Sequence, residues 1–331
     1  MRAVVIEAPG AAVVREVADP RPGPAALVRM ERVGLCGTDV KIVSGAIPVR
    51  RPRILGHELV GRVAVTGERE LVPEGTRVVI DPAIACGRCP VCRHDRPHLC
   101  PHGGLMGRDV DGGCAEYVLA AEDRLHPLPP DLSDGAAALL QVLSTCVHAQ
   151  ECVAAFPDQT AVVIGLGVAG LLHVQLLRIR GVERVIGVTR SSWKHELALS
   201  MGADVVVPPD GAAEAVAAAT DGLGADLVVE CAGTPRTLRQ SMHLAGPSGT
   251  VLAFGTTDKA DRMPTYEWYY KELTIINPRA ARPRDFPRAI ALAQNRLRLA
   301  PLISAAYPLA EAPAALASCA GSDRLKVVLD I

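Results

Sequence analysis

The amino-acid sequence predicts an α/β protein with two domains, a β-rich barrel-like domain and a doubly wound parallel sheet. As far as about Leu132 the chain shows short β-branched runs interrupted by Gly and Pro, which are typical of a barrel of short strands. From about Ala136 strand-like runs alternate with helical ones, which predicts a parallel sheet wrapped by helices. At 331 residues the chain is long enough for about two domains.

Each expected element follows from its residue pattern. In the barrel-like domain, β-branched runs predict strands at 3–8, 26–33, 59–67, 76–80 and 115–120. In the sheet domain, apolar runs predict strands at 161–164, 184–189, 203–207, 226–233, 249–255 and 272–276. Helical patterns stand between these strands at 168–181, 194–202 and near 238–244.

The last segment of the chain is expected to return to the first domain. After Pro278 come a helical pattern near 286–294 and two short strand-like runs at 301–309 and 325–330. We therefore expect a discontinuous barrel-like domain made of 1–138 and 278–331, with the sheet domain at 139–277.

Composition and charge exclude several classes of function. No apolar run reaches the roughly 18 residues that a membrane span needs, so we expect no membrane partner. The net charge of −1 argues against a nucleic-acid partner, because phosphate binding needs a basic surface. The basic stretches 50–53 and 279–284 are short and contain Pro, so solvated loops explain them better than a polyanion site. The start MRAVVIEAPG lacks a secretory signal, and we expect a cytoplasmic protein.

Four cysteines lie within fifteen residues, in the stretch CGRCPVCRHDRPHLC. Each two-residue gap lets a tight turn return the next sulfur to one metal, so the spacing predicts a tetrahedral structural zinc. Disulfides or separate reduced thiols are the alternatives, and disulfides would need an oxidising compartment. The predicted structural ligands are Cys86, Cys89, Cys92 and Cys100. The thiols expected to be small core residues are Cys114, Cys146, Cys152, Cys231 and Cys319.

A glycine-rich turn joins the expected strand at 161–164 to an apolar helix, and this context favours a dinucleotide site. Gly165 permits the tight turn, Gly167 lets the backbone approach a pyrophosphate, and Gly170 lets the helix pack on the strand. The helix N-terminus offers free N–H groups to that anion. The full set of candidate residues in this turn is Gly165, Gly167, Val168, Ala169 and Gly170.

The choice between NAD and NADP depends on the end of the next strand, where an acidic residue would bind the ribose hydroxyls of NAD. No carboxylate stands there, and the available side chains can bind a 2′-phosphate instead. They are Thr189, Arg190, Ser191 and Lys194. We expect NADP to be preferred over NAD; the alternative is that Arg190 is a solvated loop residue. Further candidate cofactor-binding residues at later strand ends are Ala232, Gly233, Phe254 and Gly255.

Two further segments of the barrel-like domain carry ligand types for a second zinc. GLCGTDVKI holds Cys36, Thr38 and Asp39, and PRILGHELVGRV holds His57 and Glu58. A thiolate, an imidazole and a carboxylate brought together suit this metal.

Together with the four-cysteine loop, GGCAEY at 112–117 and GLGVAG, these motifs resemble the zinc-dependent medium-chain alcohol dehydrogenases. They occur in the family's order and spacing, and the polyol (sorbitol) branch is the most similar. The resemblance implies a GroES-like catalytic domain and a Rossmann domain. It also implies hydride transfer between a secondary alcohol, polyol or sugar hydroxyl, or its ketone, and a nicotinamide cofactor, which the loop after the second strand predicts to be NADP(H). Two zinc ions per chain, one catalytic and one structural, and a homodimer or homotetramer are implied as well.

The resemblance also assigns roles to residues near the catalytic zinc. Cys36 and His57 match two ligands, and Glu58 matches an acidic neighbour that can bind the metal or exchange with water. The third ligand is expected in LLQVLSTCVHA, where Gln141 stands in place of the Glu of polyol dehydrogenases or the Cys of classical alcohol dehydrogenases. A neutral amide implies a more electrophilic but less tightly held metal.

Other positions match residues that handle the proton and the cofactor. Thr38 matches the hydroxyl beside the substrate oxygen, and Thr145 matches a position packed near the nicotinamide. Lys41 stands where many relatives place a relay histidine, and we assign it no catalytic role because it is mostly protonated at neutral pH.

Two alternatives and one open question remain at this level. Gln141 and the NADP-like loop favour a sugar 1-dehydrogenase of the same superfamily, and an inactive zinc-held scaffold is the alternative outside enzymes. About two zinc ions per chain would favour the enzyme and about one the scaffold. The substrate is not predicted; segments 43–53 and 263–270 are candidate linings of its pocket.

Overall fold

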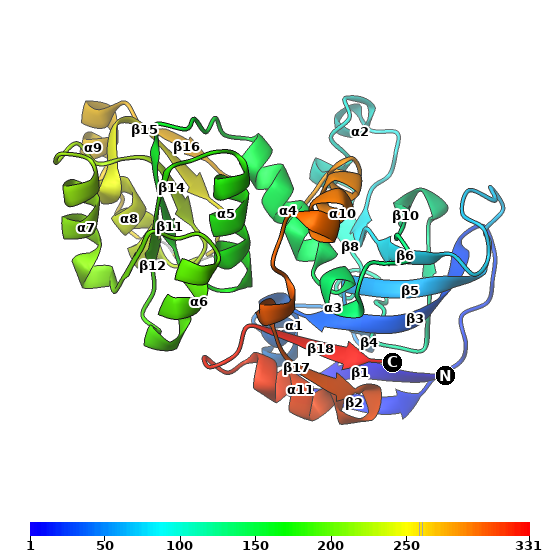
Figure 1. The fold of residues 1–331 in the computed structure, drawn as a ribbon. Coiled ribbons are helices and arrows are strands. Elements are labelled where there is room, and N and C mark those ends of the chain that lie inside the picture. Colours follow the sequence, from blue (N-terminus) through cyan, green and yellow to red (C-terminus); the bar gives the residue numbers. More distant parts are fainter. Residues whose placement is uncertain (258, 260) are drawn as a thin grey trace. The chain divides into compact units, whose positions relative to one another are not determined.

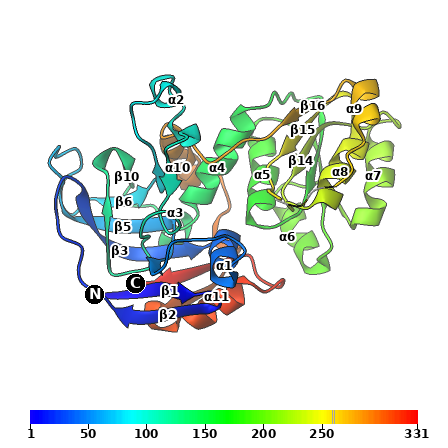
Figure 2. The ribbon, with the colours of Figure 1, turned by 180° about the vertical axis from the view of Figure 1, so that it is seen from behind.

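A computed structural model describes residues 1–257, 259 and 261–331 (Figure 1). The chain forms two compact units, one from Met1–Ser144 with Arg282–Ile331 and one from Thr145–Ala281. The first unit therefore contains both ends of the chain, which Figure 2 shows from behind. The predicted α/β class, with a barrel-like part and a parallel sheet, is confirmed. None of the described helices is both long and apolar enough to cross a membrane.

The main sheet of the first unit has seven strands, in the order β10-β6-β5-β3-β18-β17 with β9 also paired to β3. Their bounds are β3 (Ala26–Leu35), β5 (Glu58–Val65), β6 (Arg77–Ile80), β9 (Tyr117–Ala120), β10 (Leu125–Pro127), β17 (Ile303–Pro308) and β18 (Lys326–Asp330). Alternating apolar residues such as Val28, Leu59 and Ile80 point into one core because successive strand residues face opposite sides. Leu329 joins that core, so the C-terminal segment completes the sheet.

The remaining elements of the first unit surround this sheet. A three-stranded sheet contains β2 (Ala11–Glu16), β1 (Arg2–Ala8) and β4 (Arg53–Ile54), and a two-stranded one contains β7 (Ala83–Ile84) and β8 (Gly104–Leu105). The α-helices are α1 (Gly37–Ser44), α2 (Pro90–Arg93), α3 (Asp134–Ala137), α10 (Asp285–Asn295) and α11 (Ala312–Cys319). Short 3₁₀ turns occur at Pro97–Leu99, Glu122–Arg124, Ala300–Leu302 and Leu309–Glu311.

The second unit is a six-stranded parallel sheet in the order β13-β12-β11-β14-β15-β16, with helices on both faces (Figure 1). Its strands are β11 (Thr160–Ile164), β12 (Arg184–Val188), β13 (Val205–Val207), β14 (Ala225–Glu230), β15 (Ala245–Ala253) and β16 (Thr274–Ile276). Its helices are α5 (Val168–Ile179), α6 (His195–Ser200), α7 (Ala212–Ala219), α8 (Pro235–Leu244) and α9 (Thr265–Lys271), with 3₁₀ turns at Ser192–Lys194 and Pro209–Gly211. Helix α4 (Leu140–Glu151) begins in the first unit and ends in the second. The strand order reverses beside β11, which is where doubly wound sheets bind nucleotides.

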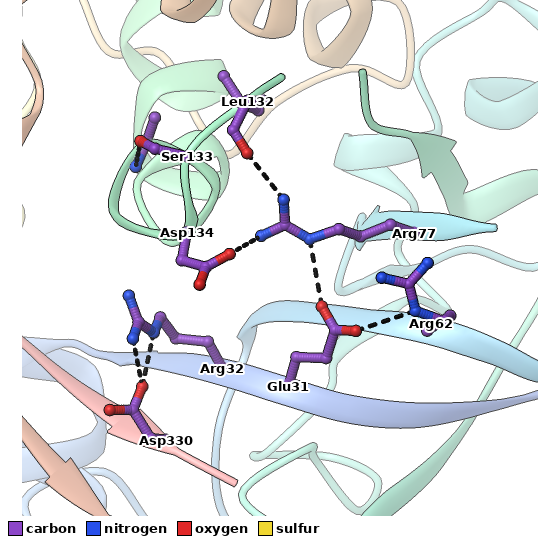
Figure 3. Close-up of polar contacts among 9 residues, drawn as sticks. Glu31, Arg32, Arg62, Arg77, Leu132, Ser133, Asp134 and Asp330 are labelled. Atoms are coloured by element: carbon purple, nitrogen blue, oxygen red, sulfur yellow. Dashed lines mark hydrogen bonds and ion pairs between the residues drawn. The ribbon is translucent and has the colours of Figure 1, made fainter. Parts of the chain in front are cut away.

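An ion-pair network ties three strands of the first unit together, as Figure 3 shows. Glu31 on β3 accepts hydrogen bonds from Arg62 on β5 at 3.1 Å and from Arg77 on β6 at 3.2 Å. Arg77 also donates to the Leu132 carbonyl at 2.8 Å and to Asp134 at 2.5 Å, which fixes the start of α3. Its side chain is 13% exposed, so this network is shielded more than an ordinary surface pair.

We expect Glu31→Gln to lower the free energy of unfolding by about 1–2 kcal/mol, because two arginines lose their shared carboxylate. Urea denaturation measures the change. Glu116→Gln is the matched control: its partner Arg2 is 54% exposed, and we expect a change within about 0.5 kcal/mol. Equal losses in the two variants would contradict the network's proposed contribution.

Candidate metal centres and nucleotide site

The thiol, imidazole and carboxylate that the sequence singled out lie together in the first unit. The ligand atoms of Cys36, His57 and Glu58 are all within 4.8 Å of one another. Cys36 stands between the end of β3 and the start of α1. Glu58 is the first residue of β5 and pairs with Gly34 of β3. The pairing of these two strands therefore brings the three candidate ligands to one point.

Asp39 contacts two of the three candidate ligands at the centre. Its Oδ2 accepts a hydrogen bond from the Cys36 backbone N–H at 2.9 Å, and its Oδ1 lies 3.4 Å from His57 Nδ1. Asp39 is fully buried, so its carboxylate faces one nitrogen of the His57 ring away from water. The sequence placed Asp39 in the motif without this role, which depends on a contact across strands.

Neighbouring groups shift the pKa values of Cys36 and His57 in opposite directions. Burial by itself would raise the pKa of Cys36, but the hydrogen bond and charge of His57 bring that pKa below its ordinary value. Burial likewise would lower the pKa of His57, but Asp39 and then Cys36 raise it well above its ordinary value. A thiolate is the form that binds zinc, so the donor chemistry fits this ion.

Glu58 is held by a lysine from the other end of the chain. Lys326 Nζ lies 2.7 Å and 2.5 Å from the two carboxylate oxygens and donates to the Leu35 carbonyl at 3.2 Å. The exposed fractions of the two side chains are 5% and 1%, so this is a buried ion pair. Burial alone would lower the pKa of Lys326, yet Glu58 raises it. A lysine beginning the buried run KVVL was the only sequence signal for this partner.

We expect Lys326→Met to lower the free energy of unfolding of metal-depleted protein by about 3–5 kcal/mol, because the Glu58 carboxylate stays buried without a cation. Chemical denaturation measures the loss. The double variant Lys326→Met with Glu58→Gln removes the orphaned charge and should recover most of it. Losses of the same size in the single and double variants would rule out this reading of the pair.

Gly34 explains how closely the start of α4 approaches the centre. A Cβ at Gly34 would overlap Glu58 Oε2 and would lie 3.2 Å from the Ala138 carbonyl. The segment that leads into α4 therefore borders the carboxylate. Gln141, in the first turn of α4, is half-buried, and the described residues include no hydrogen-bond partner for its side-chain amide. Thr38 is half-buried in the first turn of α1.

The four-cysteine cluster forms where the spacing predicts. Neighbouring sulfurs are 3.4, 3.6, 3.8 and 4.0 Å apart, and a tetrahedron with Zn–S bonds of about 2.3 Å has edges of about 3.8 Å. Backbone N–H groups of Arg88 and Cys89 lower the pKa of Cys86 to about 6. Cys89 precedes α2, and Pro90 at the first helical position fixes that turn. The cluster fits a structural zinc with no vacant position.

The second unit contains a pocket of about 540 Å³ at the glycine turn. The backbone of Gly165 has φ +91°, and a Cβ there would lie 2.9 Å from the Ala232 nitrogen, so only glycine fits. A Cβ at Gly170 would overlap the Gly165 carbonyl, as close helix–strand packing requires. Nothing lies within 4 Å of a Cβ at Gly167, which leaves its backbone open to a ligand.

The predicted 2′-phosphate residues all line this pocket, namely Thr189, Arg190, Ser191 and Lys194. The Thr189 hydroxyl accepts from the Ser191 N–H at 3.2 Å. Within the described part of the chain, neither Arg190 nor Lys194 has a carboxylate partner, although Lys194 Nζ lies 5.0 Å from the Trp193 ring centre. Two uncompensated cations thus stand beside the glycine turn.

The buried Glu230 carboxylate and its backbone carbonyl hydrogen-bond to the candidate cofactor-binding residues that follow β14 and β15. Glu230 Oε1 accepts from the N–H groups of Ala232 and Gly233 at 2.8 and 2.9 Å, and its carbonyl accepts from Phe254 and Gly255. Of these four candidates only Ala232 lines the pocket. The other predicted cofactor residues outside its lining are Thr145, Val168, Ala169 and Gly170.

The segment 263–270, expected as a possible pocket lining, contains helix α9, whose residues Tyr266, Tyr269 and Tyr270 are exposed. Trp268 instead packs inward, with its N–H on Met242. The tyrosines line a separate surface hollow beside β15 and not the nucleotide pocket.

Comparison with known proteins matches both parts of the chain. Residues 22–130 match the alcohol dehydrogenase GroES-like domain, and residues 168–295 match the zinc-binding dehydrogenase family. The D-arabitol-phosphate dehydrogenase of Enterococcus avium is 31% identical over 314 residues, which cover 92% of this chain and 89% of the relative. The sorbitol dehydrogenase of Halalkalibacterium halodurans is 28% identical, covering 96% and 94%.

A solved structure agrees over the whole chain. A protein of Sinorhizobium meliloti 1021, assigned as a zinc-binding dehydrogenase and solved with NADP bound, has a TM-score of 0.92 and 34% identity, covering 100% of this chain and 99% of that one. The chain therefore belongs to the zinc-dependent medium-chain alcohol dehydrogenase family, and it is an oxidoreductase acting on alcohols or polyols. These relatives favour an enzyme over the inactive scaffold.

Proposed function

We propose that this protein transfers hydride between a secondary alcohol or polyol, or the matching ketone, and NADP(H), with one catalytic and one structural zinc per chain. The observation that carries the proposal is the convergence of Cys36, His57 and Glu58 within 4.8 Å, backed by Asp39. The polyol class is supported by the names of the relatives, a D-arabitol-phosphate dehydrogenase and a sorbitol dehydrogenase.

Some residues of the centre would bind the metal, and others orient those ligands. Cys36 and His57 would hold the catalytic zinc with Gln141, whose amide has no other partner among the described residues. Asp39 orients His57, and Lys326 restrains Glu58, to which we assign the role of an alternate ligand. When bound, the zinc lowers the pKa of a substrate hydroxyl and polarises a carbonyl.

Proton transfer is assigned to Thr38. Its hydroxyl lies in the first turn of α1, two residues after Cys36, and is half-buried. A hydroxyl can accept and donate a proton at once, so it can pass the substrate's proton outward without becoming charged. Thr145 is proposed to pack near the nicotinamide. We assign no catalytic role to Lys41.

The preference for NADP is supported by Arg190 and Lys194, which line the nucleotide pocket without a carboxylate partner among the described residues. The test is kinetic. With one substrate at saturation, kcat/KM for NADPH should exceed that for NADH by about tenfold or more, because a phosphate gains charge-assisted hydrogen bonds. A higher kcat/KM for NADH would overturn the preference.

The substrate class is tested with a panel of secondary alcohols, polyols, aldoses and ketones, followed at the nicotinamide absorbance band. Turnover of secondary alcohols or polyols supports the proposal. Turnover of aldoses alone would instead make the protein a sugar 1-dehydrogenase, the second candidate that Gln141 favours. No turnover of any member would contradict both.

We also propose a homodimer or homotetramer. Strand β16 lies at the edge of the parallel sheet, and an edge strand presents unpaired N–H and C=O groups that a second copy can cover. The exposed tyrosines of α9 precede that strand in the chain. Sedimentation of the purified protein should give two or four times the chain mass of 34.8 kDa, and a stable monomer would refute this assembly.

A further inference from the structure

The nucleotide pocket has a third cation, which comes from a different element than Arg190 and Lys194. Arg236, near the start of α8, lines the same pocket together with Thr237 and Gln240. Arg190 and Lys194 follow β12, whereas α8 follows β14. Positive charge thus stands on two separate elements of the pocket wall.

The orientation of α8 is fixed by contacts on both of its sides. Gln240 Nε2 donates to the Pro209 carbonyl at 2.8 Å, which ties the helix to the turn after β13. Arg239, three residues along the helix from Arg236, pairs with Asp261 at 3.1 Å and does not line the pocket. Residues 236 and 240 share a helix face because they are four apart. Arg236 therefore faces the pocket by construction of the helix.

The present partner of Arg236 holds it weakly. Its guanidinium lies 3.7 Å from Asp210, and the two side chains are 78% and 95% exposed. An exposed ion pair of this length contributes little to stability, so the guanidinium is free to exchange partners. Among the described residues that line the pocket, Asp210 is the one carboxylate, whereas three residues, Arg190, Lys194 and Arg236, are cationic.

We propose that Arg236 is a specificity-determining residue that binds the 2′-phosphate of NADP from α8, in addition to Arg190 and Lys194, and leaves Asp210 when it does so. A phosphate with close to two negative charges accepts several charge-assisted hydrogen bonds and competes well with one exposed carboxylate. The same exchange gives no gain with NAD, which has a hydroxyl at that position. This inference rests on the proposed preference for NADP.

The test measures equilibrium binding of NADPH and NADH to the full-length protein by nicotinamide fluorescence. Arg236→Gln should raise the Kd for NADPH about tenfold and leave the Kd for NADH within twofold, because one charged hydrogen-bond donor is lost. Arg236→Lys should recover part of the NADPH affinity. The matched control, Arg239→Gln, lies on the same helix outside the pocket and should change neither Kd.

Asp210→Asn is the complementary variant. Removing the competing carboxylate should tighten NADPH about threefold, without effect on NADH. The Kd for NADPH should also depend less steeply on salt concentration in Arg236→Gln, since one cation fewer contacts the phosphate.

The outcomes separate this inference from the cofactor preference itself. If the wild type binds NADPH more tightly but Arg236→Gln keeps the same ratio of the two Kd values, the role of Arg236 is refuted and the preference stands. If Arg236→Gln weakens both nucleotides equally, the residue contacts the shared part of the cofactor and the inference is also refuted. Equal binding of NADPH and NADH by the wild type overturns both.

Discussion

Replacing Cys36 by alanine is expected to lower kcat by about 1,000-fold or more, because the loss of Lewis-acid stabilisation by the metal amounts to several kcal/mol. Steady-state assays with the best substrate of the panel measure the loss. The fold should survive, since the side chain lies at the junction of β3 and α1 and contributes no large apolar surface. Circular dichroism and the melting temperature check this second expectation.

Two comparisons make the Cys36 result specific. Cys319→Ala removes another half-buried thiol from the same unit and should leave kcat near the wild-type value. His57→Ala should match Cys36→Ala in its loss, because both are proposed ligands of one ion. Retention of more than about a tenth of wild-type kcat in either ligand variant would leave the metal mechanism without support.

Loss of the other metal should unfold the protein before it affects chemistry. Cys89→Ser removes one of four thiolates, and we expect the free energy of unfolding to fall by several kcal/mol because a closed zinc site supplies folding energy directly. A strong chelator should have the same effect on the wild type. Thermal melts with and without chelator measure both changes.

The matched control for this variant is Cys152→Ser. Cys152 donates through its thiol to the His148 carbonyl, and serine preserves that hydrogen bond. We expect a melting temperature close to that of the wild type and an unchanged response to chelator. If Cys89→Ser melts like Cys152→Ser, the cluster does not hold a structural metal.

Much of the fold could be predicted because local pattern and tertiary structure agree. The apolar run and glycine turn at β11 and α5 dictate a strand followed by a helix, and the structure places both there. Periodicity does not predict helix α7, since its sequence AAEAVAAA carries almost no apolar period, and its helix depends on the high propensity of alanine. Helix α9 is rich in Tyr and Trp, which favour strands, and its hydrogen bonds prevail over that preference.

In the candidate site too, features that local sequence records could be predicted, and contacts between distant residues could not. Cysteine spacing is a local signal, so the grouping of the four thiols could be predicted. The pair of Glu58 with Lys326 joins residues 268 apart, and no local pattern records which strands meet. The contacts of Asp39 with His57 and of Arg236 with Asp210 likewise depend on neighbouring strands and turns. Partners supplied by tertiary structure are therefore what sequence reasoning missed.

The most direct test of the account is a crystallographic anomalous difference map at the zinc edge, from protein purified with zinc. Two peaks per chain are expected. One should lie within the four sulfurs of the cluster, and one should lie about 2.3 Å from Cys36 Sγ and about 2.0–2.1 Å from a His57 ring nitrogen. A single peak, at the four-cysteine cluster only, would contradict the catalytic centre on which the proposed function depends.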